Sequence, residues 1–222
     1  MNHFHVSAAL LACVVAAGTS GAARGHGEAQ RQAAAGDHQQ HAAPAAPAPS
    51  AAKVVLRGDP LLDQTGKRVR LADDVIAGRI AVVNFVYTTC TTVCPITSAI
   101  FAEMQRKLGK APGRDVVLVT ITVDPVRDTP ERLREYAARY DAAEGWVYLT
   151  GAKRDVDNVL KGFGAYTPNF EDHPAMVLVG EAGGANWTRF IGFPSVDQLL
   201  ARVGELRAAR GKVGRTAQHA GH

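Results

Sequence analysis

Apolar and polar positions along the middle of the chain follow strand-like and helix-like patterns in turn. Two uninterrupted apolar runs, 80–87 and 116–123, predict strands that are buried on both faces, as in a parallel sheet. A helical pattern over 95–108 follows the first run. Thr129 and Pro130 mark the start of a second helix after the second run, because threonine caps helices well and proline suits the first helical position.

Further elements are predicted in the order strand, helix, strand, strand, helix, at 146–149, 154–162, 175–179, 187–191 and 196–210. Before the first buried run, the apolar positions of 54–56, 61–62 and 69–71 surround a turn signal at 64–67 and predict a short N-terminal β-hairpin. Strands that alternate with helices and end in a hairpin and a helix are typical of a sheet covered on both sides. We therefore expect an α/β fold with a central mixed sheet flanked by helices.

The N-terminus has the pattern of an export signal. An apolar stretch at 6–17 is followed by small residues, which predicts a signal peptide over 1–22. Residues 1–5 contain no lysine or arginine, which is unusual for such a signal. A lipid anchor on Cys13 and an uncleaved anchor are the alternatives. All three place the domain outside the cytoplasm, in a bacterial periplasm or on the outer face of the cytoplasmic membrane.

Composition divides the rest of the chain. An Ala/Pro-rich linker is expected over 23–52, because residues 33–52 hold ten alanines and three prolines without apolar periodicity. A packed domain follows over 53–210, and then a basic, histidine-bearing tail over 211–222.

The formal net charge is +4, and residues 201–222 hold five basic residues against one acidic residue. A nucleic-acid-binding protein would spread basic side chains over a face of its domain, so we expect no nucleic-acid partner.

Two cysteines remain once the predicted signal is removed, Cys90 and Cys94. They would close too small a loop for a disulfide to stabilise the fold much. They lie where a buried strand ends and a helix begins, and the helix N-terminus stabilises a thiolate there. Side chains at i and i+4 point the same way on a helix, so the two sulfurs can meet one metal ion or each other.

His173 is the only histidine between residues 42 and 218, and it precedes a predicted buried strand. Its loop can lie beside Cys90, and two thiolates with one imidazole suit Cu(I) better than Zn(II), which prefers a fourth ligand. Asp172 is a candidate to orient the His173 ring or to neutralise cationic charge. Asp124 is a second supporting candidate, or simply the cap of an Asp-Pro turn. We assign Asp128 to the start of the following helix.

Three segments, 88–95, 123–130 and Asp172-His173, resemble the Sco/SenC family of copper proteins in residue type, order and spacing. The similarity covers about 54–208. It implies a thioredoxin-like fold and one copper ion, Cu(I) or Cu(II), held by Cys90, Cys94 and His173. It also implies delivery of copper to the dinuclear copper centre of a cytochrome c oxidase subunit. The expected partners are that subunit and a periplasmic thiol reductant or upstream copper donor, with membrane contact through the partner or the N-terminus.

Other functions use the same residues. A thiol-disulfide oxidoreductase that reduces the cysteines of the oxidase subunit needs Cys90 and Cys94 but not His173. The three residues between the cysteines, where redox motifs usually have two, weigh against a general dithiol catalyst. A thiol peroxidase and a copper or redox sensor are further alternatives. We expect a metallochaperone rather than an enzyme, with thiol-disulfide reductase activity as a secondary property.

Overall fold

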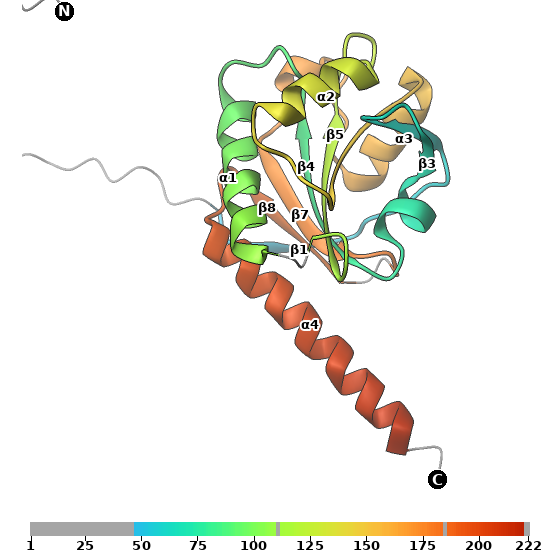
Figure 1. Cartoon of the computed structure of the whole chain (residues 1–222), viewed down its shortest axis with the longest axis vertical. Helices are drawn as coiled ribbons and strands as arrows, with labels where there is room; N and C mark the ends of the chain where they lie inside the picture. Colours follow the sequence, from blue (N-terminus) through green and yellow to red (C-terminus); the bar gives the residue numbers. More distant parts are fainter. Residues whose placement is uncertain (1–46, 110–111, 184–185, 220–222) are drawn as a thin grey trace, which may run out of the picture. The chain divides into compact units, whose positions relative to one another are not determined.

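The computed structural model describes residues 47–109, 112–183 and 186–219 (Figure 1). The predicted signal peptide and most of the predicted linker lie outside these residues. The strands are β1 Ser50–Ala52, β2 Pro60–Asp63, β3 Arg68–Arg70, β4 Ile80–Val86, β5 Val116–Thr122, β6 Trp146–Thr150, β7 Met176–Glu181 and β8 Trp187–Ile191. The helices are α1 Val93–Leu108, α2 Pro130–Ala138, α3 Lys153–Phe163 and α4 Val196–His219, with a short π-helix η1 Leu71–Ile76 and a 3-10 turn η2 Phe170–Asp172.

The described strands form one mixed sheet in the order β1-β8-β7-β4-β5-β6-β2-β3. Strands β4, β5 and β6 run parallel, and the other neighbours pair antiparallel. Every residue of β4 and of β5 is buried. This confirms the mixed sheet and its two central strands, which the uninterrupted apolar runs predicted.

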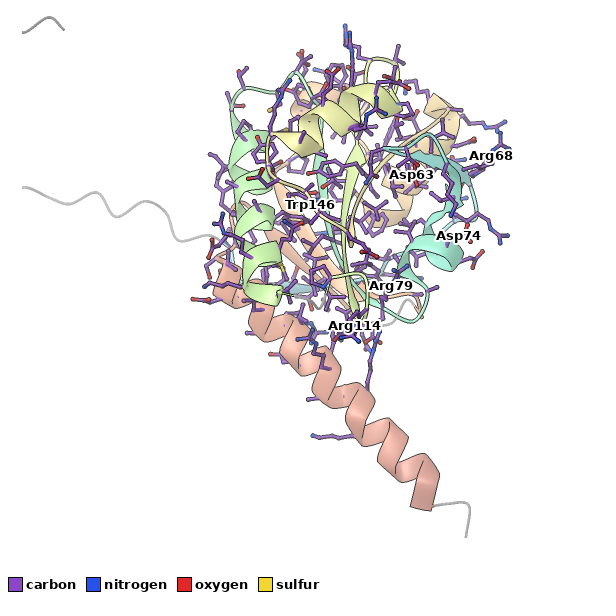
Figure 2. All side chains as sticks on the ribbon, viewed as in Figure 1. Asp63, Arg68, Asp74, Arg79, Arg114 and Trp146 are labelled. Atoms are coloured by element: carbon purple, nitrogen blue, oxygen red, sulfur yellow. The ribbon has the colours of Figure 1, made fainter. Side chains whose placement is uncertain are left out.

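Helices cover both faces of the sheet, as expected. Helices α1, α2 and α4 pack on one face, where they bury side chains such as Phe101, Tyr136 and Val203 against the strands. Helix α3 and η1 pack on the other face. Figure 1 shows α1 and α3 on opposite sides of β4 and β5. The side chain of Trp146, labelled in Figure 2, lies in the first of these layers, with its ring centroid 5.8 Å from that of Phe101.

The predicted N-terminal hairpin is confirmed, with different neighbours. Strands β2 and β3 pair antiparallel, and the Asp63 carboxylate closes their turn by accepting from the N–H groups of Thr65 and Lys67. Residues 54–56, which we expected beside this hairpin, form no strand. Instead the N–H of Val55 donates to the Gly162 carbonyl of α3. The side-chain pattern missed this because the partner of the segment is a helix end.

Two elements extend beyond the predicted domain, 53–210. Ser50–Ala52, at the end of the predicted linker, forms strand β1 and pairs with β8. This pairing uses backbone groups, so the alanine-rich composition did not reveal it. Helix α4 continues to His219, beyond residue 210. Two ion pairs, Arg207 with Asp115 and Arg210 with Glu181, join the helix to the rest of the domain.

The described residues contain no helix with the length and apolar character needed to span a membrane.

Candidate metal centre

The two cysteines lie at the junction between β4 and α1, as the sequence predicted. Cys90 belongs to the connecting turn, and its N–H donates to the Tyr87 carbonyl over 3.1 Å. Cys94 is the second residue of α1. Both thiols are free, and both are buried, with 6% of Cys90 and none of Cys94 exposed. Of the two, Cys90 is therefore the one that a partner reaches first.

The first turn of α1 brings the Cys90 sulfur close to Cys94. The Cys94 N–H donates to Cys90 Sγ over 3.4 Å, and the Thr92 hydroxyl lies 3.7 Å from the same sulfur. Thr92 precedes the helix, and its side chain makes no capping hydrogen bond to it. Cys90 Sγ thus lies among donors at the N-terminus of α1, where negative charge is stabilised.

The two thiols differ in acidity. Burial opposes ionisation of Cys90, but hydrogen bonds from the Cys94 thiol, the Cys94 N–H and Thr92 outweigh it and lower the pKa of Cys90 to about 7. Burial raises the pKa of Cys94 well above its usual range, and its hydrogen bond to Cys90 adds to this effect. Cys90 is therefore the more acidic thiol and is partly ionised at neutral pH, whereas Cys94 stays protonated until a ligand or a disulfide replaces its proton.

Alkylation of the reduced, metal-free protein tests this difference. Because only thiolates react, iodoacetamide should modify Cys90 with a rate that rises with pH through a midpoint near 7. Cys94 should react much more slowly over the same range. Tandem mass spectrometry of the labelled peptide, sampled across pH, measures both rates. Thr92→Val should move the Cys90 midpoint upward because it removes one donor, and equal rates at the two thiols would contradict the assignment.

His173 is buried, with its two ring nitrogens in different surroundings. Nε2 lies 3.3 Å from the Phe85 carbonyl oxygen of β4. A carbonyl only accepts, so Nε2 carries the proton and Nδ1 keeps its lone pair. Nδ1 is buried without a hydrogen-bond partner. Burial also lowers the pKa of His173, which favours the neutral ring. Histidines that bind metals usually donate their other N–H to such a carbonyl, so this ring has the tautomer of a ligand.

Tyr87 contacts both parts of the predicted site. Its ring packs edge-to-face on the His173 ring, with the centroids 5.7 Å apart. Burial, with a hydrogen bond to Cys90, raises the pKa of Tyr87 to about 12, so its hydroxyl stays protonated beside the thiol. Among the residues that the structure describes, no three His, Cys, Asp or Glu side chains are grouped to hold a metal ion. The structure thus brings the two free cysteines into hydrogen-bonding contact. It places the His173 ring against Tyr87, which lies beside Cys90.

The carboxylates of the two supporting aspartates bind groups other than the His173 ring. The exposed Asp172 carboxylate accepts from the Asn169 amide over 3.2 Å, and the Phe85 carbonyl holds the His173 ring in its place. Asp172 makes no hydrogen bond to this ring in the structure, and its supporting role stays a prediction. The buried Asp124 carboxylate pairs with Arg127 over 2.9 Å, and its carbonyl accepts from the Asp128 N–H. These contacts match the turn-capping alternative.

Asp128 is the residue whose role the sequence analysis missed. Thr129 caps α2 and Pro130 begins it, as predicted. The Asp128 carboxylate, however, is buried and binds Thr88, two residues before Cys90. The parallel pairing of the two apolar runs places the residues that follow them at one edge of the sheet, and this was the available signal.

Comparison with known proteins gives consistent matches. The SCO1/SenC family model matches residues 57–203. The SCO1 protein homolog of Bacillus subtilis is 34% identical over 130 residues, which are 54% of this chain and 66% of that relative. The chain therefore spans just under two thirds of that protein.

Solved structures agree with the sequence matches. Arabidopsis thaliana ScoI with copper bound has a TM-score of 0.56 and 26% identity, over 71% of this chain and 99% of that one. A second neighbour is BsSco, described with a disulfide switch as a member of the Sco family of cytochrome c oxidase assembly proteins. It has a TM-score of 0.59 and 26% identity, over 70% of this chain and 95% of that one. These neighbours confirm the thioredoxin-like fold.

Proposed function

The chain belongs to the SCO1/SenC family, and we propose on this basis that it binds one copper ion through Cys90, Cys94 and His173 and delivers it to the copper-bearing subunit of a respiratory cytochrome c oxidase. The observation that carries the proposal is the buried Nδ1 of His173, which has a lone pair and no hydrogen-bond partner. An unpaired buried nitrogen costs free energy unless a ligand uses it.

The donor set supports copper as the cargo. Thiolates and a neutral imidazole are soft or borderline ligands, and three of them suit Cu(I). The pKa of Cys90 near 7 supplies one thiolate at neutral pH. Cys94 gives up its proton when the ion binds, because only the thiolate is a ligand, so binding releases protons and strengthens as pH rises.

The location of the site supports transfer to a partner. Ligands of open α/β sheets bind beyond the carboxyl ends of the parallel strands, and Cys90 lies at that edge. The predicted export signal would place this edge in the periplasm or at the outer face of the cytoplasmic membrane, where the oxidase subunit presents its copper ligands. Exchange of ligands one at a time would then pass the ion on.

A thiol-disulfide reductase is the second candidate, and the unequal acidity of the thiols favours it. The Cys90 thiolate would attack a disulfide of the oxidase subunit, forming a mixed disulfide and releasing one thiolate of the partner. Cys94 would then lose its proton and attack Cys90 Sγ, which releases the second thiol. The pair ends oxidised, so this cycle needs a periplasmic thiol reductant.

Copper loading tests the proposed ligand set. Reduced protein that lacks residues 1–46 should bind one equivalent of Cu(I), and X-ray absorption should show two sulfurs and one nitrogen around it. Metal analysis gives the stoichiometry. A first shell of sulfur alone would remove His173 from the site, and retention of no copper by the reduced protein would refute the function.

A further inference from the structure

Asp128 provides a buried carboxylate that joins the ends of the two central strands. The Thr88 N–H donates to both of its oxygens, over 3.1 and 3.3 Å, and the Thr88 hydroxyl donates over 2.5 Å. From β5, the Thr122 hydroxyl donates over 2.6 Å. Thr122 Oγ1 also accepts from the Asp124 N–H, so its own proton is directed to Asp128. All these groups donate, and the carboxylate serves as the shared acceptor.

The carboxylate itself is firmly held. Asp128 is 1% exposed, and its N–H donates to the Asp124 carbonyl over 2.9 Å. The next residue, Thr129, caps α2 through the Arg132 N–H. Asp128 therefore connects three elements, β4, β5 and α2, at the edge of the sheet that carries the cysteines.

Thr88 is the second residue of the turn that sets the position of Cys90. The turn closes through the Cys90 N–H and the Tyr87 carbonyl, and Cys90 Sγ then accepts from the Cys94 N–H. Thr88 lies between Tyr87 and Cys90, so a shift of Thr88 would move the Cys90 sulfur relative to α1.

We propose that Asp128 is a positioning residue for the thiol pair: its carboxylate holds the Thr88 turn against β5, so that the Cys90 and Cys94 sulfurs face one site before any ligand arrives. The affinity part of this inference rests on the proposed copper function. Removing a group that orients a metal ligand through hydrogen bonds typically lowers the metal affinity by about 10-fold to 100-fold.

We call the hydrogen bonds from Thr88 to the Asp128 carboxylate the clamp. Thr88→Val tests this clamp without changing any charge. It keeps the shape of the side chain and removes the hydroxyl that donates to Asp128. We expect its Cu(I) affinity, measured by competition with a chromogenic chelator, to fall about 10-fold. The matched control is Thr91→Val, on the other side of Cys90, where the structure shows no side-chain hydrogen bond for this exposed threonine. It should stay within about 2-fold of the wild-type affinity.

A double-mutant cycle separates positioning from general stability. In an Asp128→Asn background, Thr88→Val should cost less than about 3-fold, because the two residues act through one contact. If Asp128→Asn does not fold, as judged by circular dichroism, the comparison of Thr88→Val with Thr91→Val decides alone. Equal costs of Thr88→Val in both backgrounds, or no difference between Thr88→Val and Thr91→Val, would overturn the proposal.

Amide hydrogen exchange of the reduced, metal-free protein tests the clamp independently of copper. The Cys94 amide, which donates to Cys90 Sγ, should exchange about 10-fold faster in Thr88→Val than in Thr91→Val. An unchanged rate refutes the clamp even if copper binds. If the wild-type protein binds no Cu(I), the proposed function fails, and the exchange rates alone decide on the clamp.

Discussion

The single substitutions Cys90→Ala and Cys94→Ala should each lower the Cu(I) affinity of the reduced protein by more than about 100-fold. The loss of affinity should exceed that of Thr88→Val, which only changes how the ligands are positioned, because here a proposed thiolate ligand is removed. Cys94→Ala also removes the N-terminal helix thiol that donates to Cys90, so the pKa of Cys90 should rise in this variant. Competition with a chromogenic Cu(I) chelator measures the affinities.

Met104→Leu is the matched control for the cysteine variants. Met104 is a buried sulfur-containing residue on the same helix as Cys94, and its replacement by leucine nearly conserves volume. It should bind Cu(I) as the wild type does, with a small change in thermal stability. If either alanine variant kept the wild-type affinity, the cysteine would be a packing residue and the proposed site would be wrong.

The sheet and its helices were predictable because their signals are local. Apolar runs at 80–87 and 116–123 predicted β4 and β5, and Thr129 with Pro130 predicted the start of α2. Strand β1 was not predictable in this way. It forms through backbone pairing with β8, which lies more than 130 residues later in the chain. Periodicity carries no information on such a partner.

The residues of the site were likewise predictable only where the sequence signal is local. The i, i+4 spacing at a strand-to-helix junction was enough to predict that Cys90 and Cys94 would lie together. The tautomer of His173 depends on a carbonyl 88 residues away, at Phe85, and no sequence pattern reports that contact. Asp172 was the obvious neighbour in sequence, but backbone geometry directs the ring to β4. The partners of Asp128, Thr88 and Thr122, belong to two different strand ends, so its role follows only once the two strands are paired side by side.

His173→Ala should separate copper delivery from disulfide reduction. Reduction needs an attacking thiolate and a second thiol, and both remain in this variant. In the proposed site, copper would lose its only nitrogen ligand. We therefore expect His173→Ala to keep most of any dithiol reductase activity, measured on a disulfide-containing peptide of the oxidase subunit. The same variant should fail to support oxidase assembly in cells at ordinary copper supply.

Asp172→Asn is the control in the same loop. Its carboxylate binds Asn169 and not the His173 ring, so the variant should assemble oxidase nearly as well as the wild type. Added copper should restore part of the assembly in His173→Ala, because a higher concentration of ligand compensates for weaker binding by mass action. Rescue by copper identifies affinity as the defect, since a variant that had lost its fold or its partner surface would not respond. Normal assembly in His173→Ala without added copper would instead favour thiol-disulfide reduction as the main function, with Cys90 and Cys94 as its two redox groups.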